Sequence, residues 1–211
     1  MTRRLLFLPG AGADPAFWRP LGDRLPADWD KVYFGWPGLG HQPPDPAVNG
    51  LADLVRMVEA QLGDAPCDLL AQSMGGVVAV AVALRNPGRV RRLVLATTSG
   101  GVDVEGLGGI DWRVNYRREY PHAATWIADE RPDHTDALPT ITAPTLLLWG
   151  DADPISPVAV GRRLAALLPN ARLEIVPGGD HGFVESRPDE IAPWIEAHLS
   201  ADGLEARGRF G

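Results

Sequence analysis

Short apolar segments alternate with longer helix-like segments along most of this 211-residue chain. Each apolar run is about five residues long and is bounded by Gly, Pro or Asp, which is typical of strands that helices cover on both faces. We expect six such strands, at residues 4–8, 31–35, 67–71, 92–96, 145–149 and 172–176.

The segments between these strands carry apolar residues at helical spacing. Leu51, Leu54, Val55 and Val58 recur at three- and four-residue intervals, so they share one face of a helix that can pack on a sheet. The alternation predicts one α/β domain over residues 1–200, a three-layer, doubly wound, mostly parallel sheet with right-handed crossovers. Such sheets place their sites beyond the carboxyl ends of the strands. We expect helices at residues 17–25, 51–62, 74–85, 158–168 and 188–199.

Residues 100–139 interrupt the alternation. The segment holds glycines, several charged residues and the aromatic residues Trp112, Tyr116, Tyr120 and Trp126, with no clear strand. It is long for a connection, so we interpret it as a small helical lid over the site. The alternative is a surface excursion that its aromatic side chains merely anchor.

The two ends of the chain and its charge limit the function classes further. Net charge is −7, and the 20 basic residues are scattered, which argues against nucleic-acid binding. The apolar run that follows two arginines near the start ends at Pro9, too early for a signal peptide. No run reaches the roughly 18–20 apolar residues of a membrane span.

Cys67 is the single cysteine, so no internal disulfide can form; we expect it to be buried and the protein to be cytoplasmic. Residues 201–211 are predicted to form a flexible tail.

Ser73 lies where the third predicted strand meets the following helix. Residues 70–76 read LAQSMGG, and an apolar helix follows at once. A serine in a sharp strand-to-helix turn projects its hydroxyl above the sheet, at a helix N-terminus that favours developing negative charge. The turn requires small residues two positions to either side, and these are Ala71 and Gly75. The alternative is that Ser73 only caps the helix.

This turn resembles the nucleophile elbow of the α/β-hydrolase family, GxSxG, with Ala71 at the first glycine. Residues 148–157 (LWGDADPISP) and 177–183 (PGGDHGF) resemble the acid loop and histidine loop of that family, in the same chain order. The resemblance extends over about residues 5–199 and lacks the leading antiparallel hairpin. It implies Ser73 as nucleophile, His181 as its base and Asp153 as the orienting acid. Asp151 is then expected to shape the turn by accepting backbone N–H groups.

His181 is distinguished from the four other histidines by its position. It alone follows a predicted strand and a glycine pair, whereas His198 lies in the last predicted helix. The remaining three, His41, His122 and His134, lie in loops with no strand directly before them.

Two further loops resemble segments of the same family. Residues 7–14 (FLPGAGAD) resemble its oxyanion loop, with Pro9 in place of a histidine that often braces the loop. The resemblance implies the backbone N–H groups of Ala11 and Met74 as oxyanion donors; the alternative is a simple glycine turn. Residues 36–41 (WPGLGH) resemble a loop that flanks the site. The candidate pocket residues are Trp36, Trp112, Tyr116, Trp126 and Phe183.

Together these residues predict a serine hydrolase that cleaves carboxylic esters of small to medium acyl groups through an acyl-enzyme. The expected partner is a small-molecule acyl substrate, without a cofactor, and without a metal because candidate ligands occur one per loop. The same triad also suits a lactonase, a thioesterase or a carbon–carbon bond hydrolase. A slow-turnover small-molecule receptor or signalling hydrolase is the alternative from another class, because the fold alone does not decide function.

Overall fold

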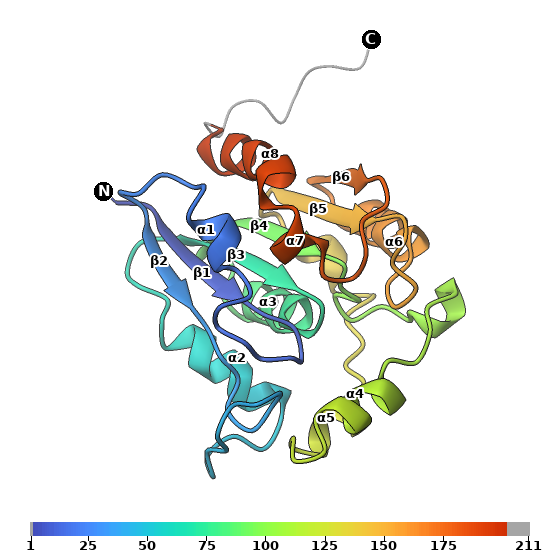
Figure 1. The fold of residues 1–211 in the computed structure, drawn as a ribbon. Coiled ribbons are helices and arrows are strands. Elements are labelled where there is room, and N and C mark those ends of the chain that lie inside the picture. The colour runs from blue at the N-terminus through green and yellow to red at the C-terminus, as the bar shows by residue number, and fades with distance from the viewer. Residues whose placement is uncertain (1, 202–211) are drawn as a thin grey trace.

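The centre of the molecule is a six-stranded sheet in which every neighbouring pair of strands is parallel (Figure 1). A computed structural model of the chain describes residues 2–201. The strand order is β2-β1-β3-β4-β5-β6. Each strand lies within two residues of its predicted place, which confirms the fold class. No antiparallel strand precedes the first strand among the residues described. The strands are β1 (Arg4–Leu8), β2 (Asp30–Tyr33), β3 (Cys67–Gln72), β4 (Val90–Ala96), β5 (Thr145–Gly150) and β6 (Ala171–Val176).

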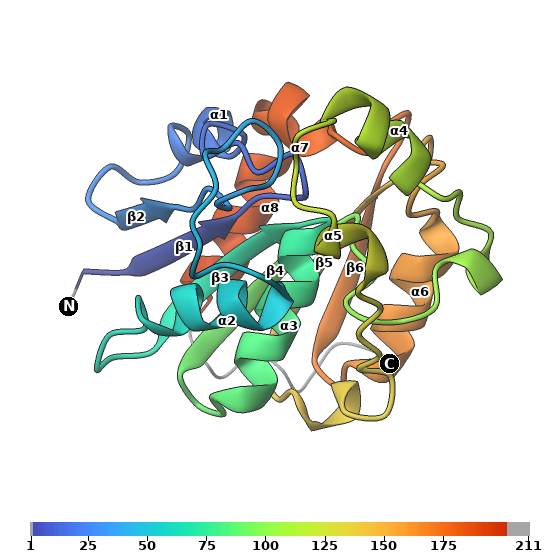
Figure 2. The ribbon, with the colours of Figure 1, turned by 90° about the horizontal axis from the view of Figure 1, so that it is seen from below.

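Helices cover both faces of this sheet. Successive strand residues point to opposite faces, so Leu6 and Leu8 enter one core while Leu5 and Phe7 enter the other. The first core contains α2 (Leu51–Glu59), α3 (Met74–Arg85) and α6 (Val158–Leu167). The second contains α1 (Arg19–Gly22), α7 (Phe183–Ser186) and α8 (Pro188–Ser200). In Figure 2, α2 and α3 lie in front of the sheet and α8 lies behind it, which gives three layers.

The first predicted helix is much shorter than expected. Residues 17–25 were predicted to be helical, but α1 contains four residues and turns flank it. Gly22 ends it at a point where a Cβ atom would lie 1.9 Å from the Tyr33 hydroxyl, and Pro26 follows soon after. The buried residues Trp18 and Leu25 still pack on the sheet, so the apolar pattern reported burial correctly but not helix length.

The segment between β4 and β5 contains no strand, as the sequence predicted. It forms two short 3₁₀ helices, η1 (Glu105–Leu107) and η2 (Leu138–Thr140), and two short α-helices, α4 (Arg113–Glu119) and α5 (Trp126–Asp129). The rings of Trp112, Tyr116 and Tyr120 pack on one another along α4, with centroid separations of 5.4 and 4.9 Å. This aromatic row stabilises a helix of only seven residues.

Two titratable side chains are built into the core. Cys67 is buried at the start of β3, as predicted, and its burial raises the pKa of the thiol to about 11. On α8, the Nε2 atom of His198 lies 3.0 Å from the Leu93 carbonyl oxygen, to which it donates. Burial, and then the nearby Arg92 guanidinium, lower the pKa of His198 from 6.5 to about 4. The imidazole is therefore neutral in the folded protein at neutral pH.

This buried imidazole predicts a loss of stability in mild acid. Between pH 6.5 and about 4 the unfolded chain protonates His198 while the folded chain does not, so the free energy of unfolding falls as pH falls. Above pH 6.5 the neutral His198 costs the folded protein no stability. Near pH 4 the free energy of unfolding has fallen on its account by about 3 kcal/mol. Denaturant unfolding of the wild type and of His198→Gln at several pH values measures it. Glutamine can donate to the same carbonyl but does not titrate, so identical pH slopes for the two proteins would contradict the prediction.

In the part of the chain that the structure describes, no helix combines the length and apolar character needed to cross a membrane. The predicted flexible tail falls on residues 201–211, of which 202–211 lie outside the described residues.

Candidate active site

Ser73 lies at a strained turn between β3 and α3. Its φ and ψ angles are 52° and −124°, a backbone conformation that residues with a Cβ atom rarely adopt. The surroundings hold it there: the Ser73 N–H donates to the Ala96 carbonyl (3.0 Å), and the Thr98 hydroxyl donates to the Ser73 carbonyl (2.5 Å). A turn fixed on both sides in this way presents the serine hydroxyl to the space beyond the sheet.

The small residues around Ser73 allow neighbouring backbone to come close. A Cβ atom on Gly75 would lie 2.4 Å from the Pro9 carbonyl oxygen, so the start of α3 touches the end of β1 directly. A Cβ atom on Gly10 would lie 3.0 Å from the Cβ atom of Ser73. Ala71, the small residue on the other side, is fully buried. The segment after β1 therefore passes immediately beside the serine.

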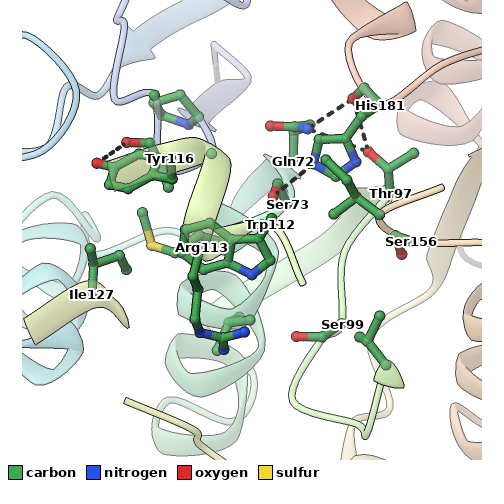
Figure 3. A pocket seen from close by; sticks show the side chains of 18 of the residues that line it. Gln72, Ser73, Thr97, Ser99, Trp112, Arg113, Tyr116, Ile127, Ser156 and His181 are labelled. Carbon is green, nitrogen blue, oxygen red and sulfur yellow. Dashed lines mark hydrogen bonds between the residues drawn. The ribbon is translucent and has the colours of Figure 1, made fainter. Parts of the chain in front are cut away.

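A hydrogen-bonded chain of three side chains joins the loops after β3, β5 and β6. The Nε2 atom of His181 lies 3.0 Å from the Ser73 hydroxyl oxygen (Figure 3), and its Nδ1 atom lies 2.8 Å from Oδ2 of Asp153. The His181 side chain is 24% exposed and that of Asp153 is fully buried. The structure thus brings together the three residues that the sequence singled out, in an order in which imidazole can take the hydroxyl proton.

Backbone donors fix the other oxygen of Asp153. Its Oδ1 atom accepts hydrogen bonds from the N–H groups of Ile155 (2.8 Å) and Ser156 (3.2 Å). Asp151, the alternative acid, is exposed and accepts from the Gly178 N–H (2.5 Å). Asp151 was expected to shape its own turn, but its carboxylate instead joins the acid loop to the backbone of the histidine loop, and it lies outside the side-chain relay.

The acid loop and the histidine loop meet through glycine. A Cβ atom on Gly150 would lie 2.0 Å from the Gly179 carbonyl oxygen, and that same oxygen accepts the Ala152 N–H at 3.0 Å. Only glycine fits at this contact, which explains why glycine stands at the end of one strand and in the pair before His181.

Two residues that the sequence did not single out hold the backbone of His181. The Gln72 side-chain amide donates to the His181 carbonyl oxygen at 3.0 Å, and the Thr97 hydroxyl donates to it at 3.3 Å. Both residues follow buried strands directly, Gln72 at the end of β3 and Thr97 after β4, so their location at the carboxyl edge of the sheet was the only available signal.

A cavity of about 970 Å³ opens beside Ser73 and His181. The loops after β1, β3, β4, β5 and β6 line it, and nearly half of its lining comes from residues 101–133 of the excursion between β4 and β5. Ala11 and Met74, the predicted oxyanion donors, both line it beside Ser73, and Met74 is the first residue of α3, where helix N–H groups lack intrahelical acceptors.

Only some of the predicted aromatic residues reach this cavity. Trp112 and Tyr116 line it, whereas Trp36, Trp126 and Phe183 are not among its lining residues. Trp36 and Phe183 are fully buried, and the Trp36 indole N–H donates to the Pro9 carbonyl at 2.8 Å. The structure does not bring these three side chains to the cavity wall; for Trp36 and Phe183 the reason is that proximity in sequence to a site loop does not tell on which side of the loop a ring packs.

Seven carboxylate side chains are among the residues that line the cavity. Burial, together with the neighbouring Asp14, raises the pKa of Glu185, and burial raises the pKa of Tyr120 to about 12. Two guanidinium groups, from Arg113 and Arg131, also line the wall.

Among residues 2–201 no group of three or more His, Cys, Asp or Glu side chains is arranged to hold a metal ion.

Comparisons with known proteins identify the family to which this chain is similar. Residues 5–194 match the model of the alpha/beta hydrolase family. A poly(3-hydroxyalkanoate) depolymerase of Ectopseudomonas oleovorans is 30% identical over 96% of this chain and 86% of the depolymerase. A pimeloyl-acyl-carrier-protein methyl ester esterase of Neisseria meningitidis is 26% identical over 90% of each protein. Polyketide synthase ThaQ of Burkholderia thailandensis is 28% identical over 93% of this chain, which spans only 12% of that synthase.

The fold is also found among solved structures. An alpha/beta hydrolase from a Medee basin deep-sea metagenome superposes with a TM-score of 0.77 over 97% of this chain and 91% of that one, at 16% identity. At this identity the likeness shows the fold alone.

Proposed function

Because the chain belongs to the alpha/beta hydrolase family, we propose that it is a serine hydrolase that cleaves carboxylic esters with Ser73, His181 and Asp153 as its catalytic triad. The observation that supports this most directly is the unbroken relay from Asp153 through His181 to the Ser73 hydroxyl, at 2.8 and 3.0 Å. Two of the similar proteins bear the names poly(3-hydroxyalkanoate) depolymerase and methyl ester esterase, which supports ester cleavage as the reaction.

The first half-reaction forms an ester on Ser73. The Ser73 oxygen attacks the acyl carbon while Nε2 of His181 takes the hydroxyl proton, since a serine hydroxyl is a weak nucleophile at neutral pH. Asp153 accepts the Nδ1–H of His181, which fixes the tautomer with its free lone pair on Nε2 and stabilises the imidazolium that forms. The bond to the leaving oxygen then breaks as His181 returns the proton to it, and an alcohol departs.

The negative charge on the substrate oxygen requires donors next to Ser73. We assign this role to the backbone N–H groups of Ala11, in the segment after β1, and Met74, the first residue of α3, which both line the cavity beside Ser73. Each such donor contributes a factor of roughly 10²–10³ in rate in serine hydrolases. Water then attacks the acyl carbon while His181 accepts its proton; the bond to the Ser73 oxygen breaks, His181 returns the proton to that oxygen, and the acid is released.

The cavity supports a small to medium acyl group as the substrate. Its volume lies at the upper end of the roughly 300–1,000 Å³ of typical small-molecule sites. Apolar side chains of the excursion, including Val102, Trp112 and Ile127, form part of the wall, which supports our proposal that the excursion is a lid. Lactones, thioesters and activated carbon–carbon bonds are alternatives for the same triad.

A fluorophosphonate probe tests the nucleophile directly. We expect stoichiometric labelling that peptide mass spectrometry places on Ser73, and loss of esterase activity in proportion to labelling. Hydrolysis of p-nitrophenyl esters of increasing chain length, beside matched thioesters and lactones, then identifies the preferred bond. Ester hydrolysis that continues undiminished in fully labelled protein, or a label on another residue, would contradict the proposal.

A further inference from the structure

We infer that Tyr116 of α4 is a positioning residue that holds the oxyanion loop, residues 9–13, in its working conformation. The inference rests on the proposed function, because it assigns a task to the backbone beside Ser73. It links the excursion between β4 and β5 to the chemistry and not only to substrate binding.

The Tyr116 hydroxyl uses both its hydrogen-bonding capacities on backbone. It donates to the Ala11 carbonyl oxygen at 2.9 Å and accepts the Gly40 N–H at 3.0 Å. The residue is only 8% exposed, and burial raises the pKa of the phenol, so the hydroxyl keeps the proton that it donates. In Figure 3, Tyr116 and His181 lie on opposite sides of Ser73.

The Gly40 partner is itself pressed against the oxyanion loop. Gly40 has a φ of +54°, and a Cβ atom there would lie 1.9 Å from the Gly12 carbonyl oxygen. The hydroxyl of Tyr116 thus joins two backbone segments that are already in contact. One side chain from α4 clamps residues 11 and 40 together.

This clamp acts on the residue that we assign as an oxyanion donor. With its carbonyl bound to Tyr116, the peptide after Ala11 cannot rotate freely, and Ala11 keeps the orientation that directs its own N–H group. Without the bond, the peptide can turn its carbonyl dipole toward the site, where a partial negative charge repels the developing oxyanion. Loss of the clamp should therefore weaken binding of the transition state more than binding of the substrate.

The phenol ring and its hydroxyl have separable roles. The ring packs against Trp112 and Tyr120, and phenylalanine keeps that packing. We expect Tyr116→Phe to lower kcat about tenfold, less than the roughly 10²–10³ that follows complete loss of an oxyanion donor. We expect KM to change less than about twofold, because substrate contacts of the ring remain.

A tetrahedral inhibitor provides a second readout that a merely structural role would not change. The affinity of Tyr116→Phe for a trifluoromethyl ketone of matched acyl length should fall by about the same factor as kcat, since its hemiketal oxygen occupies the oxyanion site. The affinity for the product acid should stay within about twofold. Tyr33→Phe, which removes a hydroxyl on β2 that does not line the cavity, is the matched control and should leave both affinities unchanged.

The outcomes separate this inference from the proposed function. Unchanged kcat and ketone affinity in Tyr116→Phe, beside an inactive Ser73→Ala, would overturn the inference alone. A raised KM at unchanged kcat would also overturn it, because the hydroxyl would then serve substrate binding. A Tyr116→Phe chain that fails to fold would assign the hydroxyl to stability and overturn it as well. Full activity in Ser73→Ala would instead remove the proposed function.

Discussion

Replacing Ser73 with alanine should lower kcat for an ester by about 10⁵-fold or more, because no other group in the relay can form the acyl intermediate. Alanine keeps the Cβ atom, so it adds no steric demand at the φ of 52° that Ser73 already adopts. The melting temperature should therefore change by no more than a few degrees. Steady-state hydrolysis and thermal unfolding of the same preparation measure the two effects.

An exposed serine provides the control for this substitution. Ser186, at the end of α7, does not line the cavity, and Ser186→Ala should keep the activity of the wild type. The assignment of Ser73 would be wrong if Ser73→Ala retained more than about one-hundredth of wild-type turnover, given the size of effect that loss of a nucleophile normally has.

Replacing Asp153 with asparagine should lower kcat by about 10⁴-fold, as in other serine triads. The hydrogen bonds explain why. Oδ1 of Asp153 accepts two backbone N–H groups, so the asparagine carbonyl must take that place and its amide N–H₂ must face His181. The amide then donates to Nδ1, the ring proton moves to Nε2, and the ring can no longer accept the Ser73 proton. Rates with an ester, and ¹⁵N chemical shifts of the imidazole, report the loss and the tautomer.

The neighbouring acid is the matched control. Asp151 is exposed and accepts only a backbone N–H group, which an asparagine side-chain oxygen also accepts. Asp151→Asn should stay within about threefold of wild-type kcat, since exposed charges outside a relay contribute little. Equal losses in the two variants would show that the acid loop as a whole, and not the Asp153 carboxylate, matters for turnover.

The strands and most helices could be predicted because burial on two faces leaves a direct mark on sequence. Short runs such as residues 146–149 are apolar throughout, and an apolar helix such as α3 begins directly after the turn that ends a strand. The predicted length of the first helix was wrong because its apolar residues mark burial and not helix length. The helix ends at Gly22, and Pro26 follows soon after.

The juxtaposition of Ser73, Asp153 and His181 could be predicted because each residue stands just after a strand, and a parallel sheet gathers those positions at one edge. The residues that hold these three in place could not be predicted from the sequence. The bonds of Gln72 and Thr97 to the His181 carbonyl join distant segments through side chains whose direction no local pattern encodes. The same holds for the buried Trp36, which packs away from the cavity.

Because β4 and β5 are parallel neighbours, the long segment between them leaves the sheet at its carboxyl edge after Ala96 and returns at the opposite edge, at Thr145. The part of this segment that lines the cavity, within residues 101–133, belongs to none of the six strands, so its length and composition can diverge, or be exchanged by grafting, without changing the strand register. The residues of this segment that line the substrate cavity thus lie apart in the chain from the triad residues that we propose react with the substrate. We expect a graft to need a hydroxyl in the place of Tyr116, and it must leave Thr97 and Thr98, which bond to the backbone of His181 and Ser73, where they are.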